Sequence, residues 1–401
     1  MGFFFLCLFP HQRKEGISLQ GLCRYLIEQG IQITKQSLQD RFTESSVNFL
    51  KRIFSHALRV RLKTTFVHQH YEFGRIVIDD STVFELPEKF DIKYRGSGGG
   101  ASKAAIKVHY CFDLLSGNIL DIRNIEGIQP DQTIDLPDLE PNDLLIEDLG
   151  FFRIDRFKRI IQLKAWFLSR LKLDSRIFLL NAGNYEVLDL LNEERKMQSG
   201  EIRVLNVFIG TKDKLPVRLI IEKVHPQISA EKRRKLKYDK QNKRKNLTAR
   251  RLKLCNLNVH VTNTSEIQIP KEIVRKFYSL RWQIEIMFKA WKSIYKIDGV
   301  RSMKIERFEC MHYGLLILIV LTHQFFAIFK NELRKNNNVE ISELKFFSCM
   351  KETLPMLNNA LNRKQKLRYY LIDLWKMIQT TCTKDQKLLK QSPYSILKLV
   401  A

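Results

Sequence analysis

The stretch GRIVIDDSTVFEL, residues 74–86, decides the fold class. Its β-branched apolar run is typical of a strand and leads into the acids Asp79 and Asp80. A second apolar run, LLIEDLG at 144–150, also ends in acids. In an α/β sheet, ligand and catalytic groups gather at the carboxyl ends of the strands. The two runs therefore predict an α/β protein whose strand-end acids meet at one edge of a sheet.

The segments around these two runs alternate between strand and helix patterns. Residues 107–127 have the pattern of two strands joined by a Ser-Gly-Asn turn, and residues 153–172 have the pattern of a helix. Strand-like runs return between about 174 and 263, which predicts an inserted β unit. Within it, residues 231–253 carry 12 Lys and Arg against two acids. This basic stretch is either a phosphate-neutralising surface or a solvated loop.

Helical patterns flank this region on both sides. Apolar residues recur every three or four positions over 15–70, and long helices are predicted at 271–295 and about 306–329. The apolar start, MGFFFLCLFP, lacks the basic segment and cleavage site of a secretory signal, so we expect it to be buried. The apolar run 314–329 is shorter than the ~20 residues of a membrane span, which favours a core helix.

The overall charge indicates a polyanionic partner. The 401 residues contain 68 Lys and Arg against 43 Asp and Glu, a formal net charge of +25. An excess of this size favours nucleic acid as the partner. The seven cysteines are scattered, with no C-x-x-C pair, which argues for a reducing compartment and against structural zinc.

One predicted helix mixes cations with a single acid. Tyr278, Arg281, Glu285 and Lys292 are spaced so that they project from one face of a continuous helix. Glu285 can join the two strand-end acids in an oxygen-only ligand set, which suits magnesium or manganese. Two such ions about 3.5–4 Å apart would stabilise both oxygens of a phosphodiester displacement. The alternative is that the acids cap the following helices or face water.

The same four residues carry a resemblance to a known family. Their Y-R-E-K spacing resembles the signature of the DDE transposases of bacterial insertion sequences. Further motifs are similar to that family in the expected order, and the similarity spans roughly 49–329: DST and LP at 80–87, the Gly-rich loop before residue 107, EDLGFF at 147–152 and SRLK at 169–172.

The resemblance implies the fold class: α/β, with a ribonuclease-H-like catalytic core interrupted by a β-rich insertion domain, and with helical N- and C-terminal regions. The interval between Asp148 and Glu285 is too long for a plain core of this kind, and the insertion accounts for it. We predict these regions: a helical DNA-binding region 1–70, the first part of the core 71–173, the basic β insertion 174–263, the second part of the core 264–330 and a helical C-terminal region 331–401.

The resemblance also implies the roles of the acids. Asp80, Asp148 and Glu285 correspond to the three catalytic carboxylates, which would bind two Mg²⁺ ions, with Mn²⁺ as a substitute. Asp79 competes with Asp80 for the first position, and Asp80 is favoured because Ser81 and Thr82 follow it. Glu147 alternates with Asp148 along the strand, so we expect a structural salt bridge there.

The implied activity is metal-dependent cleavage at the element's ends followed by strand transfer of the freed 3′-hydroxyl. The implied partners are transposon-end DNA and target DNA, held by a homodimer in the synaptic complex, in the bacterial cytoplasm at the nucleoid and without a membrane. Residues assigned to DNA are Tyr278, Arg281 and Lys292 in the signature and Arg233, Arg234, Arg244 and Lys245 in the basic stretch. The alternatives are a decayed or domesticated DNA-binding protein and a metal nuclease without strand transfer.

Overall fold

The computed structural model describes residues 2–12, 18–60, 72–242, 247–337, 339–362, 367–385 and 392–400. The chain divides into two compact units. Unit 1 comprises Met1–His68, Asp80–Gln129 and Trp282–Lys390. Unit 2 comprises Gln69–Asp79, Pro130–Arg281 and Gln391–Ala401.

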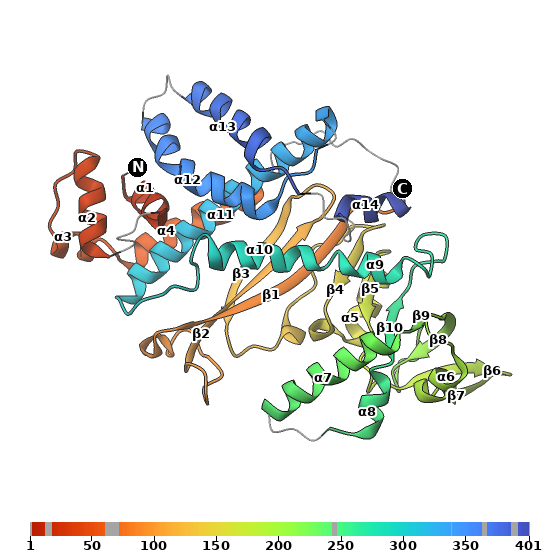
Figure 1. Cartoon of the computed structure of the whole chain (residues 1–401). Helices are drawn as coiled ribbons and strands as arrows, with labels where there is room; N and C mark the ends of the chain where they lie inside the picture. Colours follow the sequence, from red (N-terminus) through yellow and green to blue (C-terminus); the bar gives the residue numbers. More distant parts are fainter. Residues whose placement is uncertain are drawn as a thin grey trace. The chain divides into compact units, whose positions relative to one another are not determined.

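The described strands are hydrogen-bonded in the order β3-β2-β1-β4-β5-β10-β9-β8-β6-β7 (Figure 1). β1 pairs in parallel with β4, and β4 pairs in parallel with β5, whereas β2 and β3 form an antiparallel hairpin. This mixed arrangement of the first five strands is the predicted ribonuclease-H-like core. Their bounds are β1 Ile76–Leu86, β2 Ala104–Asp113, β3 Ile119–Glu126, β4 Leu144–Glu147 and β5 Trp166–Arg170.

The local sequence explains the strands that it predicts. All four residues of β4 are buried, as expected of a central parallel strand covered on both faces. The β2–β3 hairpin closes through the predicted Ser-Gly-Asn turn, where Gly117 adopts a φ of +70° that other residues disfavour. The hairpin prediction is therefore confirmed.

Two predictions about these strands are wrong. β1 does not end at Asp79 and Asp80 but continues to Leu86, because alternate residues beyond the acids, including Phe84, are buried. The predicted helix over 153–172 ends early. Its first part is α5, Ile154–Gln162, and its second part is β5, whose aromatic residues pair in parallel with β4.

The β-rich insertion extends the core sheet. β10 pairs antiparallel with β5 and with β9, so the inserted strands continue the same hydrogen-bonded ladder within unit 2. The bounds 174–263 stay a prediction, because the pairing of β10 with β5 continues the sheet from the insertion into the core without a break. The insertion contains β6 Ile177–Asn181, β7 Asn184–Val187, β8 Ile202–Ile209, β9 Leu215–Lys223, β10 Leu257–Thr262, α6 Leu190–Lys196, α7 Pro226–Asn242 and α8 Ala249–Leu254.

Helices make up both terminal regions, as predicted. The N-terminal ones are α1 Gly2–Leu8, α2 Leu19–Glu28, α3 Lys35–Asp40 and α4 Glu44–Arg59. The C-terminal ones are α11 Ile305–Asn337, α12 Glu343–Asn362, α13 Leu367–Thr381 and α14 Pro393–Leu397. The apolar start is buried from Leu6 to Phe9, and α1 and α4 pack against α11 within unit 1. By length and composition α11 could cross a membrane, but 72% of its most apolar window is buried inside the protein, as in a core helix.

The predicted helix 271–295 is broken in two. α9 covers Val274–Ser279 and α10 covers Trp282–Ser293. Between them, the amides of Leu280 and Arg281 donate to carbonyls three residues back, a tighter turn than that of an α-helix. The prediction that Tyr278, Arg281, Glu285 and Lys292 share one continuous helical face is therefore wrong.

The contact of α1 with α11 leads to a stability prediction. A Cβ atom on Gly314 in α11 would lie 2.2 Å from the carbonyl oxygen of Cys7 in α1. We expect Gly314→Ala to lower the free energy of unfolding by about 1–3 kcal/mol through overpacking. Without this close approach, alanine would be favoured over glycine in a helix interior by about 1 kcal/mol. Chemical denaturation shows whether Gly314→Ala lowers or raises the free energy of unfolding. A more stable variant would contradict the packing of α1 on α11.

Candidate active site

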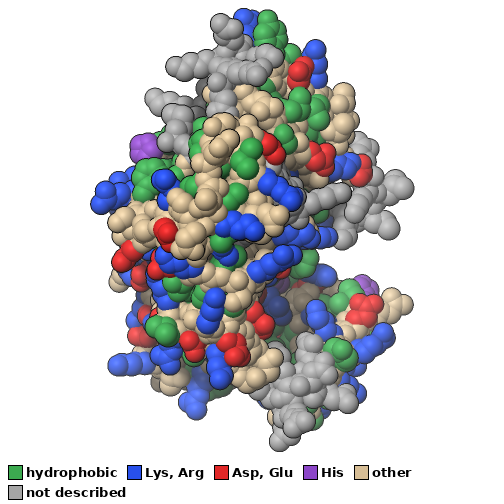
Figure 2. All heavy atoms as spheres, turned by 90° about the vertical axis from the view of Figure 1, so that its left-hand side faces the viewer, with side chains coloured by type: hydrophobic (Ala, Val, Ile, Leu, Met, Phe, Trp, Pro, Cys, Tyr) green, Lys and Arg blue, Asp and Glu red, His purple; other side chains and the backbone are tan. Residues whose placement is uncertain are grey.

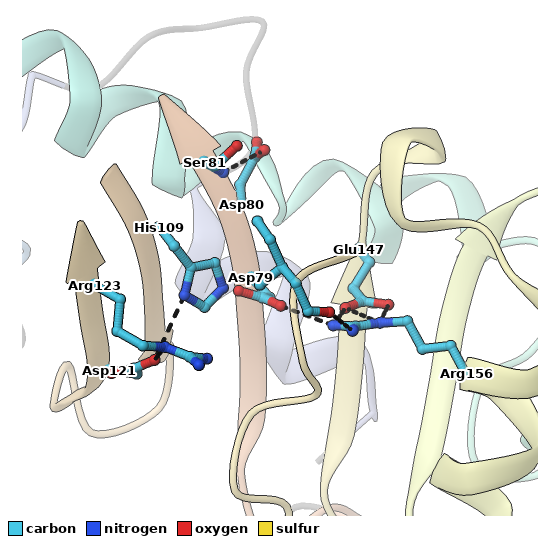
Figure 3. Close-up of polar contacts among 9 residues, drawn as sticks. Asp79, Asp80, Ser81, His109, Asp121, Arg123, Glu147 and Arg156 are labelled. Atoms are coloured by element: carbon cyan, nitrogen blue, oxygen red, sulfur yellow. Dashed lines mark hydrogen bonds and ion pairs between the residues drawn. The ribbon is translucent and has the colours of Figure 1, made fainter. Parts of the chain in front are cut away.

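The first acid of each predicted pair is held by one buried arginine. Arg156 in α5 donates from Nη2 to Asp79 Oδ2 at 3.0 Å and from Nε to the two carboxylate oxygens of Glu147 at 3.0 and 3.1 Å (Figure 3). Its Nη1 donates to the Ile134 carbonyl at 2.7 Å. Asp79, Glu147 and Arg156 are all buried. The salt bridge predicted for Glu147 is therefore confirmed.

The electrostatics of this cluster are those of a structural group. The pKa of Glu147 is raised to about 7, because burial and the neighbouring Asp79 carboxylate raise it by more than Arg156 lowers it. One guanidinium thus serves two carboxylates in the interior of unit 2. Arg156 was missed at the sequence level, although it lies on the buried face of α5 beside Phe157 and Ile160, a position where an arginine needs an acidic partner.

The second acid of each pair is only half-buried. Asp80 lies in β1, where its Oδ1 accepts the Ser81 backbone N–H at 2.8 Å. Asp148 follows β4 directly, and its Oδ1 accepts the Tyr278 hydroxyl at 3.2 Å. Burial, followed by the Asp148 charge, raises the pKa of Tyr278, so the phenol stays protonated and donates. Asp148 and Tyr278 both belong to unit 2.

The third acid lies beside Asp80's strand. Glu285 is half-buried in the first turn of α10, and Lys292 lies in the last turn. Lys292 Nζ is 3.4 Å from the Val83 carbonyl of β1, which places α10 against the half of β1 that follows Asp80 (Figure 1). Within unit 1, α10 with Glu285 thus packs against β1 with Asp80. Asp148 belongs to unit 2.

The donor chemistry of these three acids suits magnesium. Asp80, Asp148 and Glu285 offer hard carboxylate oxygens with partial exposure, as an Mg²⁺ or Mn²⁺ site requires. Asp79 and Glu147 are occupied by Arg156 instead. Within the described ranges, no group of three or more His, Cys, Asp or Glu side chains is gathered closely enough to hold a metal ion.

The predicted DNA-contacting cations differ in their surroundings. Arg233 in α7 is half-buried, and its Nη2 donates to Ser229 Oγ at 3.1 Å and to the Asn256 side chain. Arg234, the next residue, is exposed. Arg281 is half-buried between α9 and α10. Arg244 and Lys245 lie outside the described residues.

Comparison with known proteins shows the family. A family model described as "Transposase DDE domain" matches residues 71–321. The transposase for insertion sequence element IS231E of Bacillus thuringiensis subsp. finitimus is 31% identical over 417 residues, covering 98% of this chain and 87% of that protein. The transposase for insertion sequence element IS1151 of Clostridium perfringens is 33% identical over 394 residues, covering 92% and 82%. A solved piggyBac transposase synaptic complex with hairpin DNA covers 98% of this chain and 77% of its own, with 12% identity and a TM-score of 0.48.

The chain therefore belongs to the DDE transposase family, since the matched domain covers more than half of it. The similarity to transposases of insertion sequence elements extends over nearly the whole chain. Within the family, it is a transposase of the bacterial insertion-sequence kind, as the Y-R-E-K signature predicted.

Proposed function

We propose that this transposase binds the terminal inverted repeats of an insertion sequence, cuts the DNA at their ends and joins the freed 3′-hydroxyl to target DNA. Asp80, Asp148 and Glu285 are the catalytic carboxylates. The reaction depends on divalent metal ions, Mg²⁺ or Mn²⁺, and two copies of the chain act together to hold both ends.

One observation carries the choice of acids. Two consecutive acids, Asp79–Asp80, lie in β1, and two more, Glu147–Asp148, lie at the last residue of β4 and the extended residue after it. Arg156 holds the first of each pair in the interior. Since side chains alternate along a strand, the second of each pair points to the other side and keeps partial exposure. This difference supports Asp80 over Asp79 and Asp148 over Glu147.

The chain's own residues then have distinct roles. Asp80, Asp148 and Glu285 would hold two ions, which supply an activated water and stabilise the leaving oxygen. Tyr278 donates to Asp148 and orients its carboxylate, and it stays among the residues proposed to contact transposon-end DNA. Arg281 grips a phosphate of the transposon end with its two-pronged guanidinium, and Lys292 supplies a point charge at the end of α10.

The basic stretch is proposed as a further DNA surface. Arg234 is exposed and available for phosphate, whereas Arg233 already donates within unit 2 and contributes mainly charge. Figure 2 shows Lys and Arg side chains spread across one face of the molecule among Asp and Glu, and not gathered in one patch. Arg244 and Lys245 remain part of the proposal from their sequence alone. A cytoplasmic, nucleoid-associated location follows from these partners.

The test is an assay with a labelled terminal repeat, Mg²⁺ and a supercoiled target plasmid. Joined product that requires Mg²⁺ or Mn²⁺ supports the proposal. Binding without nicking selects the non-catalytic DNA-binding alternative. Nicking without joined product selects a metal nuclease without strand transfer.

A further inference from the structure

A group of polar residues in unit 2 connects to Asp148 through Tyr278. In the antiparallel pairing of β5 with β10, Arg170 lies directly opposite His260. The ring of His260 lies 5.1 Å from the ring of Tyr278, centroid to centroid. The Tyr278 hydroxyl in turn donates to Asp148. Cross-strand neighbours on one face of a sheet have Cβ atoms about 4.5–5.5 Å apart, so Arg170 is a close neighbour of this group.

A second cation reaches the same face of β10. Asn258 lies two residues before His260 and therefore on the same side of the strand. Lys232 in α7 hydrogen-bonds to the Asn258 side chain and to the Leu257 carbonyl, the latter at 3.1 Å. Lys232 is thereby fixed beside His260.

A third cation approaches from α9. Arg275 Nη1 lies 3.0 Å from Glu222 Oε1, and the other oxygen of Glu222 accepts the Asn258 amide at 2.7 Å. Glu222 is thus the carboxylate that pairs with this group. In the described part of the chain, the exposed Arg170 guanidinium has no ion pair or hydrogen bond. Among the described residues, Arg275 is the member of this group that forms an ion pair with Glu222, and Lys232 hydrogen-bonds to Asn258 and Leu257 instead. We call Arg170, Lys232 and Arg275 the cation cluster.

The electrostatics show that these cations act on one another. Burial, followed by the charges of Arg170 and Arg275, lowers the pKa of Lys232 to about 8, against smaller opposing effects of Cys255 and Glu222. Burial and the same cations lower the pKa of His260 to about 3, so its ring is neutral at physiological pH. Three like charges with Glu222 as their paired carboxylate still repel one another, and a bound anion would reduce that repulsion.

We propose that the cation cluster binds a backbone phosphate of DNA next to Asp148. This inference rests on the proposed function and adds to it residues from β5, α7 and α9 outside those already assigned to DNA. The cluster is connected to Asp148 through His260 and Tyr278, so its phosphate would lie near the scissile one. Guanidinium and ammonium groups are the side chains that recognise phosphate oxygens.

The test compares Arg170→Gln with Arg159→Gln. Arg159 in α5 is also exposed and lies outside the cluster, so the control makes the same change of charge. The probe is a fluorescent duplex of arbitrary sequence, because phosphate contacts do not depend on sequence. For Arg170→Gln we expect the slope of log affinity against log salt to become shallower by about 0.9, the value of one lost contact.

Thermal unfolding of the same variants separates binding from folding. Since Arg170→Gln removes repulsion within the cluster, its unfolding temperature should equal or exceed that of the unmodified protein while its DNA affinity falls. A salt slope equal to that of Arg159→Gln would overturn the proposal. So would an affinity loss that appears only together with a lower unfolding temperature.

The charge of Lys232 gives an independent readout. Because its pKa is lowered to about 8, its charge is lost in the free protein as pH rises through that value. DNA affinity should therefore fall between about pH 7 and about pH 9, and Lys232→Gln should lack that fall. Arg170, Arg275, Glu222, Cys255 and the neutral ring of His260 are the charged and titratable groups around it. An identical fall in Lys232→Gln would contradict its assignment.

Two further arms distinguish the sources of failure. If inorganic phosphate stabilises the unmodified protein but Arg170→Gln leaves DNA affinity unchanged, the cluster binds free anions and the DNA assignment is wrong. If Arg170→Gln binds and cuts DNA normally while Asp148→Asn does not cut, the cluster inference fails and the proposed function stands. If the unmodified protein cuts no DNA, the proposed function fails. The difference in salt slope between Arg170→Gln and Arg159→Gln still tests whether the cation cluster binds DNA.

Discussion

Replacing Asp148 by asparagine is expected to abolish DNA cleavage and strand transfer while DNA binding is kept. The amide has the same shape but no charge, so it cannot help to neutralise divalent ions. Loss of several kcal/mol of transition-state stabilisation corresponds to a rate decrease of about 10³-fold or more. The same result is expected for Asp80→Asn and Glu285→Gln, measured by gel assay of the labelled terminal repeat.

The neighbouring acids provide matched controls for this experiment. Glu147→Gln changes the adjacent residue, which is buried and bound to Arg156, and should keep the cleavage rate at temperatures where the variant is folded. Asp79→Asn is the corresponding control for Asp80. If Asp148→Asn cleaves at the normal rate and folded Glu147→Gln does not, the assignment of the acids is reversed.

The second large effect concerns stability. Arg156→Met is expected to lower the free energy of unfolding by about 3–5 kcal/mol, because it leaves two buried carboxylates without their partner. Asp79 and Glu147 are 0% and 2% exposed, so water cannot replace the guanidinium. The exposed Arg159→Met, one turn further along α5, should change stability by no more than about 0.5 kcal/mol. Chemical denaturation measures both variants.

The pH dependence of this variant has a definite sign. Burial already raises the pKa of Glu147 to about 7, and loss of Arg156 raises it further. When folding raises the pKa of a carboxyl, that group stabilises the fold fully at pH values below its pKa in the unfolded state. This stabilisation is lost as the pH rises through its pKa in the folded state. Arg156→Met should therefore be relatively more stable near pH 5 than near pH 8. Equal stability of Arg156→Met and Arg159→Met would show that the buried cluster contributes little.

The sequence predicted correctly those elements that are determined by residues close together in the chain. The β2–β3 hairpin follows from its turn residues and β4 from a short apolar run. β5 was missed because Trp166–Arg170 continues the pattern of the preceding helix, and its strand conformation depends on pairing with β4 and β10. The break before Trp282 was also missed, since Leu280 and Arg281 are ordinary helix residues and no proline or glycine marks the turn.

The site was predictable to a different degree. The sequence identified the acids by position and by their resemblance to a family, but which member of each pair is buried depends on Arg156. Arg156 becomes their partner only when α5 packs on the sheet. The cation cluster was not foreseen for the same reason, because its members come from β5, α7 and α9 and meet through the pairing of β10.

The paired acids also constrain how this gene can tolerate insertions and deletions. Side chains alternate between the two faces of a sheet. A one-codon insertion that shifts β1 or β4 by one residue against the neighbouring strand would therefore move each of its side chains to the opposite face. Asp79 or Glu147 would then point outward, and the acid after it would move to the side of Arg156 but further along the chain, so the ion pairs of Arg156 would be lost. Length changes within these two strands should therefore be far less tolerated than changes in the loops that join them.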